Sequence, residues 1–183
     1  MRRILICLLL ISASCADEEL EVYNTIGGDF ILHDQFGDEY QLSAHNGKIR
    51  LLFFGFTHCP DICPTTLAEV QEVWRQLSAE QQQQIEILFA SVDPERDSSD
   101  LLRDYLGSFD LPVIGLRGSD AEMLEITAQY ASFYEKVTLD STLRYTIDHS
   151  SQTFVIDRQG EIRGWVTYDQ PPSALLELLK RLL

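Results

Sequence analysis

Two cysteines four positions apart, Cys59 and Cys63, are the residues of this chain best suited to chemistry. They follow an apolar run at residues 51–56 that has the character of a buried strand. After them comes Pro64 and then a helical pattern of apolar residues. Proline suits the first helical position, where its missing N–H costs nothing, and it disfavours helical geometry at the preceding residue. We therefore expect both sulfurs at the mouth of a helix, whose positive end stabilises a thiolate.

The spacing of the pair leaves two states open. Side chains four apart in a regular helix have Cβ atoms about 5–6 Å apart, whereas a disulfide needs about 3.5–4.5 Å. Cys59 and Cys63 can therefore hold a metal ion between them, and they close into a disulfide only if the first turn is irregular. Pro60 makes such irregularity accessible.

The segment at residues 54–67 resembles the copper-site motif of the Sco/SenC proteins, which are thioredoxin-like copper-binding factors in cytochrome c oxidase assembly. Three further blocks are similar to this family and occur in the right order: residues 28–30 with the hairpin that follows, residues 91–97, and residues 148–150. The resemblance spans about residues 27–168. It implies that Cys59, Cys63 and His149 bind copper, and that the copper passes to the binuclear site in a subunit of cytochrome c oxidase.

Two thiolates and one imidazole form a soft three-ligand site, which suits Cu(I) and also accommodates Cu(II). Zinc is the competing metal, but it usually takes four ligands, and the sequence fixes no fourth. Asp61, between the cysteines, and Asp93, after a predicted strand, are candidates for supporting contacts around the ligands. Each has a structural alternative, Asp61 as an exposed loop carboxylate and Asp93 as part of a turn. For Asp93 the turn is the favoured interpretation.

The elements that must position these residues alternate along the chain. A hairpin at residues 30–42 precedes strands at 51–56, 85–92 and 113–116, with helices near 64–77, 99–106 and 119–131 and a polar loop at 81–84. A hairpin at 153–166 and a helix from residue 171 follow. This order predicts an α/β, thioredoxin-like fold: a mixed central sheet with helices on both faces and an N-terminal β-hairpin extension. The helix near residue 119 is expected to bury Leu124, Ala128 and Ala131.

The predicted topology places the cysteines at the carboxyl end of a central strand, where open α/β sheets bind ligands. Thioredoxins carry a cis-proline just before the strand that opens the last hairpin, facing their cysteine pair. This chain has no proline at residues 150–153, and His149 lies in that neighbourhood instead.

The N-terminal residues are expected to direct export. Arg2 and Arg3 precede an apolar stretch at residues 4–11 that is too short to span a bilayer. Residues 12–15 end in Cys15 and resemble a bacterial lipobox, although Ser12 replaces the usual leucine; ordinary signal cleavage is the alternative. We expect a signal peptide with a lipobox at 1–15, an acidic linker at 16–26 and a copper-binding domain at 27–183. The protein is then periplasmic and anchored to a bacterial membrane by lipid at Cys15.

The composition indicates one globular domain and argues against a nucleic-acid partner. The 183 residues are 45% hydrophobic, which suits one globular domain, and the formal net charge of -15 argues against nucleic acid, which needs a basic surface. The chain has four cysteines, of which Cys7 would leave with the signal and Cys15 would carry lipid. Cys59 and Cys63 then remain as one local disulfide or one metal site in an oxidising compartment.

Two functions compete for this site. The first is a copper chaperone, which is not an enzyme, with a thiol reductant and another copper donor as further partners. The second is a thiol–disulfide oxidoreductase that keeps the cysteines of a copper-receiving partner reduced, with Cys59 and Cys63 as its redox-active catalytic pair. The three-residue spacer and the missing cis-proline argue against the second, because oxidoreductases use two intervening residues. A copper or redox sensor is a third interpretation that one sequence does not separate from delivery.

Overall fold

The computed structural model describes residues 20–140 and 144–183. Its centre is a seven-stranded sheet in the order β2-β1-β5-β4-β3-β8-β9. Strands β3, β4 and β5 run parallel, and β8 is antiparallel to β3, so the sheet is mixed. The strands of this sheet are β1 (Ile31–Asp34), β2 (Glu39–Gln41), β3 (Ile49–Gly55), β4 (Ile85–Ser91), β5 (Val113–Arg117), β8 (Thr153–Ile156) and β9 (Ile162–Val166).

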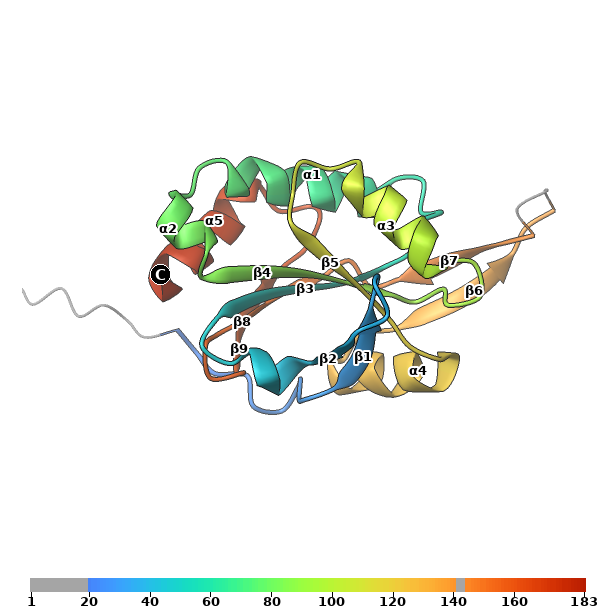
Figure 1. The fold of residues 1–183 in the computed structure, drawn as a ribbon, viewed down its shortest axis with the longest axis horizontal. Helices are drawn as coiled ribbons and strands as arrows, with labels where there is room; N and C mark the ends of the chain where they lie inside the picture. The colour runs from blue at the N-terminus through green and yellow to red at the C-terminus, as the bar shows by residue number, and fades with distance from the viewer. Residues whose placement is uncertain (1–19, 141–143) are drawn as a thin grey trace, which may run out of the picture.

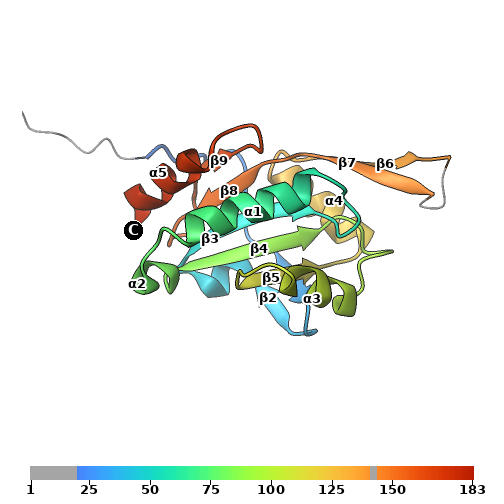
Figure 2. The same ribbon diagram turned by 90° about the horizontal axis from the view of Figure 1, so that it is seen from above.

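Helices cover both faces of this sheet (Figure 1). On one face lie α1, α3 and α5, and on the other lies α4, as seen again from above in Figure 2. Each face has its own buried apolar cluster, because every residue of β3 is buried and alternate side chains point to opposite faces. The predicted α/β architecture is therefore confirmed. The helices are η1 (Leu42–His45, a 3-10 turn), α1 (Ile62–Trp74), α2 (Ala79–Gln82), α3 (Ser99–Gly107), α4 (Asp120–Gln129) and α5 (Pro172–Leu182).

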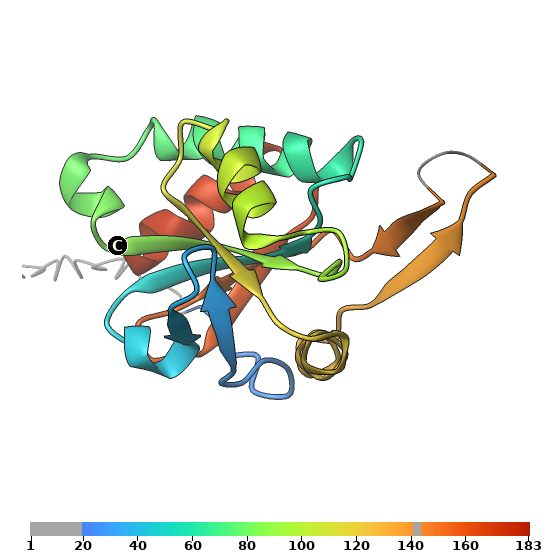
Figure 3. The same cartoon turned by 45° about the vertical axis from the view of Figure 1, so that its right-hand side comes forward.

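A second, two-stranded sheet was not predicted from the sequence. Strands β6 (Tyr134–Thr138) and β7 (Tyr145–His149) pair antiparallel, with Tyr134 opposite His149. This hairpin extends away from the body of the domain (Figures 1 and 3). Its β6 strand is mostly exposed and therefore lacks the apolar alternation that marks a half-buried strand. His149 is consequently the last residue of a strand.

The start of α1 also differs from the prediction. The helix begins at Ile62, so Cys63 lies inside its first turn and Pro64 is the third helical residue. Proline is tolerated there because the N–H groups of the first turn have no acceptor within the helix. The expected loop at 81–84 is partly helical, since Ser78 and Gln81 form a reciprocal capping box at the start of α2.

Helix α4 faces the sheet with a different stripe from the one predicted. Met123, Ile126 and Thr127 are its buried residues, while Leu124 is 58% exposed. The helix ends at Gln129, and Ala131 follows with a φ of 48°. Ala128 and Ala131 are exposed as well. The predicted stripe was wrong because the spacing put Leu124 and Ala128 on one face without showing that this face points to solvent, and because Ala131 lies beyond the helix end.

Residues 20–26 are the described part of the expected acidic linker, and they run beside β9. The Tyr23 N–H donates to the Ile162 carbonyl at 2.9 Å, and the Tyr23 ring packs edge-on against Trp165 with centroids 4.8 Å apart. The expectations for the signal peptide and Cys15 fall at residues 1–19, outside the described residues. Across residues 20–140 and 144–183, none of the helices has both the length and the apolar character needed to cross a bilayer.

Candidate metal centre

The structure brings Cys59, Cys63 and His149 together at the carboxyl end of β3. One ligand atom from each lies within 4.8 Å of the others. The His149 Nε2 atom is 3.5 Å from the Cys63 Sγ and 3.8 Å from the Cys59 Sγ. Neither of these cysteines forms a disulfide. This is the grouping expected from the sequence, and it can place three soft donor atoms around one ion.

The two sulfurs have different environments. Cys63 is fully buried in the first turn of α1, and Cys59 is half-buried in the loop before it. A hydrogen bond from Cys63 lowers the pKa of Cys59 to about 4, assisted by contact with His149 and by the backbone N–H groups of Cys63 and Asp61. Burial raises the pKa of Cys63, and the neighbouring Cys59 sulfur raises it further. Without metal, Cys59 is therefore the thiolate of the pair and Cys63 keeps its proton.

The first turn of α1 explains the position of the thiolate. The backbone N–H of Cys63 points to the Cys59 Sγ at 3.4 Å. N–H groups in the first turn of a helix lack intrahelical acceptors, so the sulfur accepts from a donor that would otherwise be unpaired. The Cys59 N–H donates in turn to the Phe56 carbonyl at 3.2 Å, which folds the loop back toward the end of the strand.

The imidazole of His149 is oriented by its own backbone. Its Nδ1 lies 2.9 Å from the Ser150 carbonyl oxygen, and a carbonyl can only accept, so Nδ1 carries a proton. In the neutral ring this leaves the lone pair on Nε2, the atom that faces both sulfurs. The rings of Phe53 and Phe56 approach the imidazole edge-on at 6.3 and 5.7 Å between centroids. His149 is therefore held in the tautomer that a metal ion requires.

The two candidate carboxylates take different positions. Asp61 is exposed just before α1 and makes no side-chain cap of that helix. Asp93 is fully buried; it accepts from the Tyr145 hydroxyl at 2.7 Å and from the Arg96 Nε at 2.5 Å. The Asp93 carbonyl accepts from the Arg96 and Asp97 N–H groups, as the favoured turn interpretation expects, but that interpretation did not include the contacts of the side chain. They reach across to β7, the strand that ends at His149.

Gly55 is a site residue that sequence reasoning missed. It is the last residue of β3, and a Cβ atom placed on it would lie 2.9 Å from the Cys63 Sγ. Any larger residue would push against the sulfur that completes the site. The only sequence signal was a glycine at the end of an apolar run, which also occurs wherever a strand simply turns.

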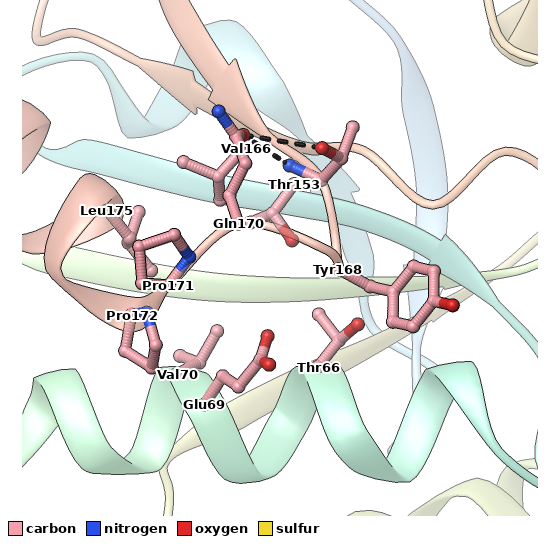
Figure 4. Close-up of a pocket in the computed structure, with 11 residues that line it drawn as sticks. Thr66, Glu69, Val70, Thr153, Val166, Tyr168, Gln170, Pro171, Pro172 and Leu175 are labelled. Carbon is pink, nitrogen blue, oxygen red and sulfur yellow. Dashed lines mark hydrogen bonds between the residues drawn. The ribbon is translucent and has the colours of Figure 1, made fainter.

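Two hollows lie near these elements. One of about 440 Å³ opens beside Cys59 and His149 and is also lined by Pro60, Asp61 and the 62%-exposed Phe133. The other, of about 20 Å³, lies between α1, the β8–β9 pair and the start of α5 (Figure 4). It is lined by Thr66, Glu69 and Pro171 among others and contains no candidate ligand. Access to the metal centre is therefore through the first hollow.

Known proteins place this arrangement in a family. The model of the SCO1/SenC family matches residues 18–183. The chain belongs to the SCO1/SenC family. A SCO2-like protein of Rickettsia felis is 38% identical to it over 158 residues, covering 85% of this chain and 76% of that protein. A putative copper-binding protein of Stutzerimonas stutzeri is 30% identical over 152 residues, covering 83% of this SCO1/SenC protein and 74% of the relative.

Solved structures agree with the family assignment. The structure of ScoI from Bradyrhizobium japonicum with copper bound has a TM-score of 0.77 and 38% identity, covering 86% of this SCO1/SenC protein and 99% of that chain. The likeness confirms the thioredoxin-like fold expected from the sequence. Unlike thioredoxins, the described residues of this SCO1/SenC protein contain no cis peptide bond, and the imidazole of His149 faces the cysteine pair.

Proposed function

We propose that this protein binds copper through Cys59, Cys63 and His149 and delivers it to the binuclear copper site of cytochrome c oxidase. The observation that carries the proposal is the convergence of the three ligand atoms within 4.8 Å of one another. Thiolate and imidazole donors are soft enough for Cu(I), and they also bind Cu(II) as a thiolate complex. The copper-bound relative and the oxidase link implied by family resemblance support copper as the cargo.

The unequal burial of the ligands suits transfer. Cys63 is buried in the first turn of α1, whereas Cys59 and His149 line the hollow of about 440 Å³. A receiving protein can therefore approach copper from the side of Cys59 and His149 and replace these ligands one at a time. The thiolate state of Cys59, with a pKa of about 4, allows copper to bind at neutral pH without first removing a proton from this sulfur.

A thiol–disulfide oxidoreductase remains the second candidate. The observation in its favour is the low pKa of Cys59 beside a protonated Cys63, because a thiolate attacks disulfides. In such an enzyme Cys59 attacks the disulfide of the substrate, one substrate sulfur leaves as a thiol, and a mixed disulfide forms. Cys63 then loses its proton and displaces the second substrate sulfur, so the substrate gains two electrons and Cys59 and Cys63 become a disulfide.

Copper titration of the purified, reduced chain tests the first proposal. We expect one copper per protein and, with Cu(II), a thiolate-to-metal charge-transfer band. His149→Ala should bind at least about 100-fold more weakly, because loss of even an orienting partner of a ligand costs about 10–100-fold. His33→Ala is the matched control, since His33 lies exposed on β1. No binding above that of a Cys59→Ala/Cys63→Ala variant would reject copper carriage.

The same variants separate the two candidates. An oxidoreductase uses only the sulfurs for electron transfer, so His149→Ala should keep most of its activity toward a test disulfide. Weak copper binding that is indifferent to His149, together with rapid disulfide reduction, would favour the oxidoreductase.

We propose further that the domain works on the periplasmic side of a bacterial membrane, with lipid on Cys15. The support is the sequence of residues 1–15, in which positive, apolar and small residues precede a cysteine. A thiol reductant is then required outside the cytoplasm, because an oxidising compartment otherwise joins Cys59 and Cys63 in a disulfide, and a copper donor is the further partner that we propose there. Replacing Cys15 by serine should release the protein from membranes, measured by fractionation, if this lipid is the anchor.

A further inference from the structure

The ligands of the proposed copper site come from two separate pieces of structure. Cys59 and Cys63 belong to the loop and helix after β3, whereas His149 ends a hairpin whose strands form their own sheet. Backbone pairing with the central sheet therefore does not fix the hairpin. The chain itself joins the His149 end of the hairpin to the central sheet, because β8 begins at Thr153. Along the rest of β7, side-chain contacts hold the hairpin against the domain and help to decide how His149 meets the sulfurs.

Arg96, in the loop between β4 and α3, makes several contacts with the first residue of β7. Its Nη1 donates to the Tyr145 carbonyl at 2.9 Å, and its guanidinium lies over the Tyr145 ring at 3.7 Å from the centroid. Its Nε donates to the Asp93 carboxylate at 2.5 Å, and that carboxylate accepts from the Tyr145 hydroxyl at 2.7 Å. Arg96, Asp93 and Tyr145 thus form a closed ring of contacts across the two segments.

The members of this ring are shielded from water to different degrees, and Tyr145 is only partly buried. Asp93 is fully buried, and the side chain of Arg96 is 17% exposed. A planar guanidinium can donate in two directions while stacking on a ring, a combination that lysine cannot reproduce. On the outer side, Lys136 of β6 pairs with Glu95 at 3.1 Å, but both of these groups are exposed enough that the pair contributes little.

The same loop also holds the cysteine segment. Asp97 is fully buried and accepts from the Thr57 N–H at 3.0 Å and from the Thr57 hydroxyl at 2.6 Å. Thr57 lies two residues before Cys59. The Ser91 hydroxyl, at the end of β4, donates to the same carboxylate at 2.6 Å, which ties the arrangement to the central sheet. Three residues of one loop, Asp93, Arg96 and Asp97, therefore contact the two ligand-bearing segments between them.

We infer that the loop at residues 92–98 braces the two halves of the copper site, and that Arg96 is the positioning residue for His149. The effect on copper coordination rests on the proposed function, whereas the effect on the position of the hairpin does not, since the contacts exist in the protein without metal. Side chains at alternate positions of a strand share a face, so Tyr145, Ile147 and His149 point the same way. Ile147 is buried, and the contact of Arg96 with Tyr145 fixes the other end of that face.

Mutation of Arg96 tests the brace with two independent readouts. In metal-free protein, Arg96→Met should speed amide hydrogen exchange across β7 by at least about tenfold relative to β3 and β4, because local opening becomes easier. In the Cu(II) form it should weaken or abolish nitrogen hyperfine coupling in the electron paramagnetic resonance spectrum while the thiolate charge-transfer band persists. Arg96→Lys should fall between wild type and Arg96→Met in both.

Arg103→Met is the matched control, because Arg103 makes an exposed ion pair with Asp100 on α3. It should leave both readouts unchanged. Wild-type exchange in β7 together with an unchanged nitrogen signal in Arg96→Met would overturn the inference.

If Arg96→Met also loses protection in β3 and β4, Tyr145→Phe decides the question. It removes only the hydroxyl bonded to Asp93, and faster exchange confined to β7 supports the brace, whereas unchanged exchange overturns it. Failure of wild type to bind copper would reject the proposed function alone, because the hydrogen-exchange result does not depend on metal.

Discussion

Replacement of Gly55 by alanine should damage both the fold and the metal centre. A Cβ atom on Gly55 would lie 2.9 Å from the Cys63 Sγ and 3.0 Å from ring atoms of Phe53 and Phe89. Comfortable contacts between non-bonded carbons are about 3.5–4.0 Å. All three neighbours are almost completely buried, so none can turn out into water. The added methyl group must therefore push the sulfur or the strand aside.

The size of the effect follows from this overlap. Inserting a methyl group into a well-packed core typically costs about 1–3 kcal/mol, and contact on three sides places Gly55→Ala in the upper part of that range. For a protein of this length each kcal/mol lowers Tm by about 2–4 °C, so we expect a loss of about 4–12 °C. Displacement of the Cys63 sulfur away from His149 should also weaken copper binding.

Thermal unfolding of the metal-free protein and copper titration measure the two consequences. Gly107→Ala is the control, because a Cβ there meets nothing within 4 Å and the residue ends α3. The control should be neutral or stabilising by about 0.4–1 kcal/mol through the unfolded state. A Gly55→Ala protein with wild-type Tm and wild-type copper affinity would refute the argument that this glycine makes room for the sulfur.

Two further predictions concern the cysteine loop. Because the pKa of Cys59 is about 4, the rate of its alkylation by iodoacetamide should be nearly independent of pH from 6 to 8 and should fall as the pH falls through about 4. Buried Cys63 should stay unmodified, and mass spectrometry measures both results. An alkylation rate that rises through about pH 8.5, as for an ordinary thiol, would contradict the prediction. Asp97→Ala should cost about 2–4 kcal/mol, because it removes a charged acceptor of hydrogen bonds from the Thr57 N–H, the Thr57 hydroxyl and the Ser91 hydroxyl. Asp97→Asn should cost less, since its amide oxygen can still accept from Thr57 and Ser91. Denaturant unfolding measures both variants, and equal losses would show that the charge matters more than the hydrogen bonds.

Local apolar patterns in the sequence predicted much of the fold. Buried strands such as β3 and β4 are continuous apolar runs, because both faces of the sheet are covered. Cys59 and Cys63 follow such a run directly, so their position at the end of a central strand was predictable. The order of strands and helices then determined the α/β class, and family resemblance added His149.

The sequence was a weaker guide to which face of a helix is buried and to strands with few apolar residues. Helix α4 buries Met123 and Ile126 and leaves Leu124 exposed, and the periodicity of a short helix does not specify which apolar residue faces outward. The β6–β7 hairpin carries few buried residues. Its existence depends on contacts with the rest of the domain, and these leave little trace in local composition.

By itself the sequence determined the cysteine pair, the alternation of strands and helices, and the soft chemistry of the candidate ligands. These are local properties, encoded by residue type, spacing and hydrophobic period. Only the tertiary structure decided how deeply Cys63 is buried at the start of α1, why Gly55 must lack a side chain, and how Arg96 joins Tyr145 to Asp93. Each of these depends on atoms brought together from distant parts of the chain. The energy of such a contact is determined by the distance between the atoms and by their burial, and the separation of two residues in sequence gives neither quantity.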